Sequence, residues 1–175
     1  MARAAQSDAI ALLKADHRKV EDLFAKFEKA RDAEKKQQLA TQICTELTIH
    51  TIIEEEIFYP ACREAIKDED LLDESFVEHD GAKVLIAELE AGSPSEEFYD
   101  AKMSVLSEQI KHHVREEEKP SQGLFAQARA AGLDLVQLRT RMQARKQELM
   151  SQFETDLPPP KMRTMTAITV QVGAK

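Results

Sequence analysis

The histidines of this chain recur in matching sequence contexts. The stretch DHRKVEDLFAKFE, which carries His17, is matched downstream by EHDGAKVLIAELE, which carries His79. A second matched pair follows, with HTIIEEE beginning at His50 and HVREEEK beginning at His113. Imidazole and carboxylate groups are common ligands of iron, manganese and zinc. The repeat therefore indicates a duplicated helical hairpin that carries these candidate metal ligands: His17, His50, Glu54, His79, His113 and Glu117.

Helical spacing places these residues on faces that an apolar core would cover. Residues four apart share a helix face, so His50 lies with Glu54 and His113 lies with Glu117. Each histidine also falls on the apolar stripe of its own helix. A lone histidine on such a stripe is more often a hydrogen-bonded core residue. Two buried carboxylates, however, need a positive partner, and six ligands with two bridging carboxylates favour two ions over one tetrahedral zinc.

Other polar residues nearby are interpreted differently. The face of His112 carries Glu108 and Gln109, which predicts a surface residue or a partner of the ligands rather than a ligand. Tyr59 lies about 180° around a regular helix from His50, which predicts packing at the periphery. The remaining glutamates of the two EEE runs are expected to face solvent. Cys44 and Cys62 are expected to be buried thiols, with no C-x-x-C spacing between them.

Apolar residues recur with helical periodicity, which predicts an all-α protein. The expected architecture is an up-down-up-down four-helix bundle over residues 1–119. Ser7 and Asp8 can cap a first helix that ends near residue 30. A second helix is expected to start near Asp32 and to kink or break at Pro60.

The third helix is predicted over 69–91, with Gly92 just after its end. The sequence Ser93-Pro94-Ser95-Glu96 has the form of a capping box with proline at the first helical position, so a fourth helix is expected to start there. It should end before Pro120, because proline cannot continue a helix.

Residues 120–156 carry no metal-ligand pattern and are predicted to form a helical extension. A short helix over 121–131 should end at Gly132, and a longer one should cover 133–155. This extension is expected to pack on an apolar face of the bundle or on a second subunit, which would give a homodimer through the C-terminal helix. Residues 157–175, beginning LPPPK, are predicted to be a disordered tail.

Composition excludes several classes of function. The formal net charge is −8, with acidic and basic residues interspersed, so neither nucleic acid nor an anionic membrane is an expected partner. No apolar run approaches the ~20 residues of a membrane-spanning helix. The N-terminus lacks the apolar segment of a signal peptide, which predicts a cytoplasmic location.

The quoted motifs resemble those of hemerythrin-like HHE cation-binding domains. The resemblance rests on DHRKVE around His17, HTIIEEEIFYP from His50, VEHDGAK around His79 and HHVREEE before Lys119. It implies a four-helix bundle that holds two iron ions, an oxo- or hydroxo-bridged di-iron centre. The four histidines would then be terminal ligands, with Glu54 and Glu117 bridging.

One position departs from the pattern of the oxygen-carrying hemerythrins. Those proteins have a fifth histidine four residues after the one that matches His79, and this chain has Lys83 there. Lysine is a poor iron ligand at neutral pH. The repeat aligns Glu21 with Lys83, so either water or Glu21 is expected to fill the position. A missing protein ligand favours reaction or weak metal retention over reversible oxygen carriage.

These observations predict a non-haem di-iron protein that binds or reacts with a small gaseous or peroxide ligand such as O2, NO or H2O2, in scavenging or sensing. Three alternatives remain open. The chain could store or deliver iron without chemistry of its own, or it could be a regulatory protein whose C-terminal helix responds to the metal. It could also be a metal-free structural bundle.

Overall fold

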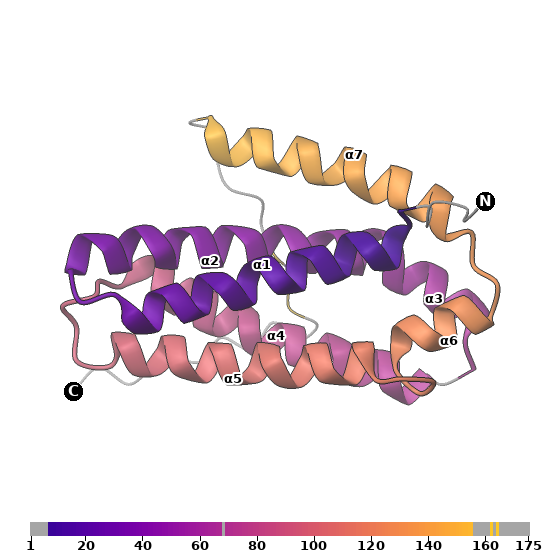
Figure 1. The fold of residues 1–175 in the computed structure, drawn as a ribbon, viewed down its shortest axis with the longest axis horizontal. Coiled ribbons are helices and arrows are strands. Elements are labelled where there is room, and N and C mark those ends of the chain that lie inside the picture. The colour runs from indigo at the N-terminus through magenta and orange to yellow at the C-terminus, as the bar shows by residue number, and fades with distance from the viewer. Residues whose placement is uncertain (1–6, 68, 156–161, 163, 165–175) are drawn as a thin grey trace, which may run out of the picture.

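The computed structural model of the chain describes residues 7–67, 69–155, 162 and 164. The all-α, up-down-up-down four-helix bundle predicted from the sequence is confirmed (Figure 1). Among the described residues, none of the helices combines the length and apolar character needed to cross a membrane. The four bundle helices are α1 (Ala9–Lys29), α2 (Ala33–Ile53), α4 (Glu69–Ala91) and α5 (Tyr99–Glu118).

The first hairpin begins and turns at capping aspartates. The side chain of Asp8 accepts a hydrogen bond from the backbone N–H of Ala11 at the start of α1, at 2.9 Å. Asp32 does the same for the backbone N–H of Lys35 at the start of α2, at 2.8 Å. Each cap satisfies a backbone donor that the helix itself leaves unpaired.

The predicted start of the fourth helix is wrong. The helix α5 begins at Tyr99, and its N-cap residue Phe98 makes no side-chain capping bond. The hydroxyl of Ser93 is hydrogen-bonded to that of Ser95 instead, and the backbone N–H of Glu96 donates to the Ser93 carbonyl. The serines therefore stabilise a turn between the helices, and the helix begins where Tyr99 is buried in the core.

The second helix changes geometry before its proline. A π-helical turn, η1 (Glu54–Phe58), follows α2 and leads into α3 (Tyr59–Ala65). The backbone N–H of Tyr59 donates to the carbonyl of Glu54, five residues back rather than four. Pro60 has no N–H to continue the regular ladder, so the predicted irregularity is present but lies upstream of the proline.

The C-terminal extension forms two helices, α6 (Leu124–Ala130) and α7 (Leu135–Glu154). A Cβ at Gly123 would lie 2.5 Å from the carbonyl oxygen of Glu117, so glycine lets the chain turn tightly at the end of α5. Gly132 has a φ of +77° and ends the short helix, as predicted. Helix α7 packs outside the bundle, along α1 and α2 (Figure 1). The predicted tail, 157–175, lies outside the described residues except for 162 and 164.

Two apolar clusters fill the interior. One joins the start of α1 and the end of α2 to η1, α3, α6 and α7. The other joins the second half of α1 and the first half of α2 to α4 and α5. The six candidate ligands are buried polar residues that belong to neither cluster.

Candidate metal centre

The bundle buries all six candidate ligands. The four histidines are between 2% and 6% exposed, Glu54 is 0% exposed and Glu117 is 1% exposed. Carboxylate side chains such as these two glutamates are almost never fully buried unless they are paired or bind a metal. Their burial follows from the sequence, because each lies on the apolar stripe of its helix.

The histidines form two pairs. In the N-terminal pair, the Nε2 atoms of His17 and His50 are 3.1 Å apart. In the C-terminal pair, the Nε2 atoms of His79 and His113 are 3.2 Å apart. Two nitrogen ligands at ~2.1 Å from an ion and at right angles would be separated by roughly 3 Å. Each pair therefore has the spacing of two ligands on one ion.

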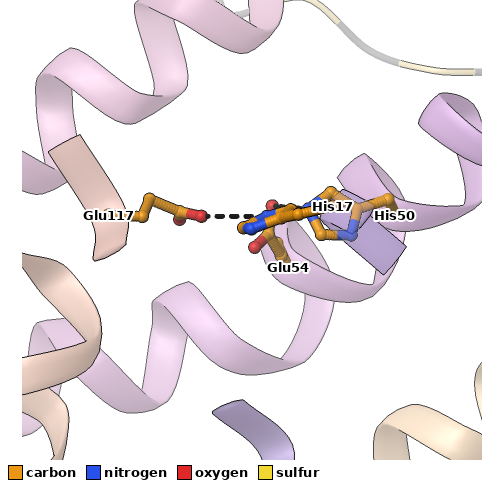
Figure 2. A group of neighbouring side chains, drawn as sticks. All are labelled: His17, His50, Glu54 and Glu117. Atoms are coloured by element: carbon orange, nitrogen blue, oxygen red, sulfur yellow. Dashed lines mark hydrogen bonds and ion pairs between the residues drawn. The ribbon is translucent and has the colours of Figure 1, made fainter. Parts of the chain in front are cut away.

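Each central carboxylate reaches both pairs. Glu54 Oε2 lies 3.2 Å from His50 Nε2 and 3.4 Å from His79 Nε2. Glu117 Oε2 lies 3.4 Å from His17 Nε2 and 3.6 Å from His113 Nε2. Figure 2 shows Glu117 reaching from a separate helix toward His17, while Glu54 lies close beside His17 and His50.

The free oxygen atoms of these carboxylates fit a metal. Glu54 Oε1 and Glu117 Oε2 are buried without a hydrogen bond from any part of the chain that the structure describes. Buried polar atoms rarely remain unpaired, because the loss of solvation is costly. Two groups of side chains have ligand atoms close enough to hold a metal: His17, His50, Glu54 and Glu117, and Glu54, His79 and His113.

The outward nitrogen of each histidine faces a carboxylate. His17 Nδ1 is 2.7 Å from Glu118, and His79 Nδ1 is 3.0 Å from Glu55. Carboxylates that accept from the far side of an imidazole fix its orientation and make it a stronger metal ligand. The prediction that the remaining glutamates of the EEE runs face solvent is therefore wrong for these two residues.

The outward nitrogen atoms of His113 and His50 each face the residue that precedes the first histidine of the same hairpin. His113 Nδ1 is 2.7 Å from Glu78, and His50 Nδ1 is 3.7 Å from Asp16. The sequence contains a signal for this arrangement that was missed. Asp16 aligns with Glu78 in the repeat, and each faces the histidine on the second helix of its own hairpin.

The carboxylates also shift the pKa values of the histidines. Burial would lower the pKa of His50, but the charges of Glu54 and Asp16 outweigh it and raise the pKa to about 10. His79 is affected in the same way by Glu54 and Glu55, with a pKa of about 9. A metal ion would compete with protons for these nitrogen atoms, so binding would release protons.

Tyr59 lies in this site, and the prediction that it packs at the periphery is wrong. The residue is fully buried, and its hydroxyl lies 2.9 Å from Glu117 Oε1. The same oxygen is 3.2 Å from His79 Nε2 and 3.4 Å from His113 Nε2. The π-turn adds one residue to the helical turn, which rotates the following side chains by about 100° relative to a regular helix. A prediction that assumes a regular helical period therefore puts the Tyr59 side chain on the wrong face of the helix.

Lys83 and Glu21, which the repeat aligns with each other, have different surroundings in the structure. Lys83 Nζ lies 2.8 Å from Glu55 Oε1 and 3.0 Å from Asp80 Oδ1, so it binds the carboxylate that faces His79. Glu21 pairs with Arg18 at 3.0 Å, and the structure does not bring it into the cluster. Besides Glu54 and Glu117, the residue that brings an oxygen atom to the C-terminal pair is Tyr59 rather than Glu21.

His112 and the cysteines lie outside the cluster. The side chain of His112 is 57% exposed, and its Nε2 atom lies 3.2 Å from Glu78 Oε1. It is therefore a surface residue that contacts the partner of His113. Both Cys44 and Cys62 are free and buried, and burial raises the pKa of each thiol to about 12. Neither thiol is poised to ionise at neutral pH.

Comparison with known proteins identifies the family of the chain. The chain is 33% identical over 118 residues to a DNA nickase from Nostoc sp. (strain PCC 7120). This match covers 67% of the chain but only 32% of the nickase. A solved hemerythrin HHE cation-binding domain-containing protein from Mycobacterium kansasii has the same fold, with a TM-score of 0.68 and 23% identity. That match covers 85% of this chain and 93% of the other. The hemerythrin HHE cation-binding domain family matches residues 8–123, and the chain belongs to this family.

Proposed function

We propose that the chain binds two iron ions, one at each histidine pair, and that Glu54 and Glu117 bridge them. The observation that carries the proposal is the position of the two carboxylates. Each lies within 3.6 Å of one histidine from the N-terminal pair and one from the C-terminal pair. A carboxylate shared between two imidazole pairs is suited to bridging two metal ions, and its charge would offset theirs.

The ligand types favour iron. Imidazole and carboxylate together suit iron, whereas soft thiolate ligands select zinc or copper(I) in many sites. The candidate ligand groups within the described residues contain only histidine and glutamate. The hydroxyl of Tyr59 adds an oxygen atom beside the Nε2 atoms of the C-terminal pair. Burial and neighbouring carboxylates raise the pKa of this hydroxyl, so a metal ion would be needed to ionise it.

A small molecule such as O2, NO or H2O2 is the proposed ligand. The bound iron would supply electrons and an open coordination position. A small pocket touches both histidine pairs, and its other walls include the apolar side chains of Val20, Leu47, Ile110 and Val114. Its size and apolar walls suit a small diatomic or peroxide rather than a large or charged substrate. The proposed role is therefore scavenging or sensing of such a molecule.

The proposal concerns the metal-binding bundle and does not extend the nickase activity to this chain. The match covers only about one third of the length of the Nostoc nickase, so the activity of that whole protein is not carried over. The formal net charge of −8 also opposes binding to a phosphate backbone.

The test begins with anaerobic loading of the purified chain with Fe(II). Two irons per chain are expected, followed by a change in the visible spectrum on addition of O2, NO or H2O2. A chain that holds two irons but responds to none of the three would instead be a storage or delivery module. A chain that retains no iron would contradict the proposal. Glu117→Ala is the negative control, because it removes a bridging ligand.

A further inference from the structure

Helix α7 lies outside the four-helix bundle but carries two cations that reach the vicinity of the metal centre. Its apolar side anchors it, since Leu138 is 4% exposed and both Met142 and Leu149 are 0% exposed. Arg145 makes two hydrogen bonds to Glu56 in η1, at 2.7 and 3.1 Å. The next residue, Lys146, donates a hydrogen bond to Asp16 Oδ1 in α1.

Asp16 lies between Lys146 and His50. It is 7% exposed, and the Lys146 side chain is 11% exposed, so the contact is largely shielded from solvent. The other carboxylate oxygen, Oδ2, faces His50 Nδ1 at 3.7 Å. This distance is too long for a hydrogen bond. Neither Asp16 Oδ2 nor His50 Nδ1 has another hydrogen-bond partner in the part of the chain that the structure describes.

The equivalent contact in the second hairpin is different. Glu78 occupies the repeat position of Asp16, and it lies 2.7 Å from His113 Nδ1. The neighbour of Glu78 on its other oxygen is His112, on the surface of α5, at 3.2 Å. No lysine from the extension is shown bound to Glu78 in the described structure. The two hairpins thus differ at this carboxylate, and the difference coincides with the docking of α7.

We infer that Lys146 is a positioning residue for His50, acting through Asp16, and that helix α7 thereby adjusts one of the two metal positions. The inference rests on the proposed function, since it assumes that His50 is a metal ligand. Lys146 holds Asp16 by one oxygen and keeps the other beyond hydrogen-bonding distance of His50. A carboxylate that bonds the outward N–H of a ligating imidazole makes the imidazole a stronger ligand. His50 is therefore the least braced of the four histidines.

The shorter side chain of aspartate offers a rival explanation. Asp16 has one methylene fewer than Glu78, and this difference alone could account for the longer distance to the histidine. The two explanations separate when Lys146 is replaced. If Lys146 holds Asp16 away, its removal frees the carboxylate to bond His50. If side-chain length sets the distance, His50 will not respond.

The experiment uses the full chain loaded with Co2+ and proton NMR. Each metal-bound histidine should give one paramagnetically shifted signal from its Nδ1–H, and the exchange rate of that proton with solvent reports its hydrogen bond. The variants are Lys146→Met, Lys146→Arg, Asp16→Asn and the double variant Lys146→Met with Asp16→Asn. The matched control is Arg129→Met, which breaks another ion pair between the extension and the first hairpin, the 2.9 Å contact with Asp8.

In Lys146→Met, one of the four signals should exchange more slowly by about tenfold or more, while the other three keep their rates. Lys146→Arg should restore the original rate, and Lys146→Met should have no further effect in the Asp16→Asn background. Arg129→Met should leave all four signals unchanged. An unchanged set of signals in Lys146→Met would overturn the inference, as would an equal change in all four, which would indicate general loosening of the fold. Failure of the unmodified chain to bind Co2+ would count against the proposed metal site itself.

Discussion

The two histidine pairs come from equivalent parts of the repeat, yet their surroundings differ. Their shared features follow an approximate twofold relation. In each hairpin, the residue before the first histidine faces the second histidine, as Asp16 faces His50 and Glu78 faces His113. The residue after each central carboxylate faces the first histidine of the other hairpin. The repeated hairpin thus supplies both the candidate ligands and the carboxylates around them.

The differences come from residues outside the duplicated pattern. Phe125 of α6 stacks on His17, with ring centroids 5.8 Å apart and planes inclined by 12°. Tyr59, which the π-turn directs inward, lies instead beside His79 and His113. The N-terminal pair is therefore covered by an apolar ring, and the C-terminal pair by a ring that carries an oxygen atom. The extension and one irregular turn make two similar half-sites chemically distinct.

The largest effect is expected where the two halves share a ligand. Glu117→Ala removes a carboxylate that contacts both pairs, so both ions should be lost, with a decrease in affinity of more than ~100-fold. Metal content after gel filtration measures this. Glu116→Ala is the matched control, because that neighbouring side chain is 39% exposed and pairs only weakly with Lys119 at 3.9 Å. Retention of one tightly bound ion in Glu117→Ala would show that the halves do not depend on this bridge.

Removal of one histidine should affect metal binding at its own pair and leave binding at the other pair intact. His17→Ala should lose the ion at the N-terminal pair and retain the other, and His79→Ala should do the reverse. In the proposed arrangement a histidine would bind only the ion of its own pair, whereas Glu54 and Glu117 each contact one histidine of both pairs. Metal content near one ion per chain, with different visible spectra for the two variants, is the expected result. Loss of both ions from both variants would show that the positions fill only together.

Replacement of an outward carboxylate should have a smaller, local effect. Glu78→Gln keeps the shape of the side chain but weakens its bond to His113, so metal affinity at the C-terminal pair should fall by ~10–100-fold. Competition with a chelator measures the affinity of each position. Glu108→Gln serves as the control, because Glu108 lines a surface groove together with Glu78 and His112 but is exposed. If Glu78→Gln and the unmodified chain bind metal with equal affinity, the Glu78 carboxylate does not strengthen His113 as a ligand.

Much of the bundle could be predicted from the sequence, because its signals are local. The apolar period, the caps at Asp8 and Asp32 and the glycine after α6 all act within one helical turn. The start of α5 was mispredicted because the burial of Tyr99 is a tertiary interaction that a capping pattern does not contain. The placement of the central histidines and glutamates followed from the same period, since each lies on a regular helical stripe.

The surroundings of the ligands were less accessible to sequence reasoning. Glu55 and Glu118 appear solvent-facing on a single helix, and only the approach of the other hairpin gives them histidine partners. The contact between Lys146 and Asp16 joins residues 130 positions apart, and no local pattern indicates it. Tyr59 was misplaced for another reason, since a period of 3.6 residues fails once a π-turn inserts a residue.

The smallest effect is expected at Tyr59, whose hydroxyl lies beside only the C-terminal histidine pair. Tyr59→Phe removes one oxygen atom and leaves the ring, which packs against Phe76 and Phe58, so the fold should be kept. Both ions should still bind, because their histidines and carboxylates are unchanged. If the tyrosine oxygen binds iron, the unmodified Fe(III) protein should show a visible phenolate-to-iron charge-transfer band that the variant lacks. Identical spectra would mean that Tyr59 acts only as a hydrogen-bond donor to the central carboxylates Glu54 and Glu117, and the two pairs would then be more alike than their surroundings suggest.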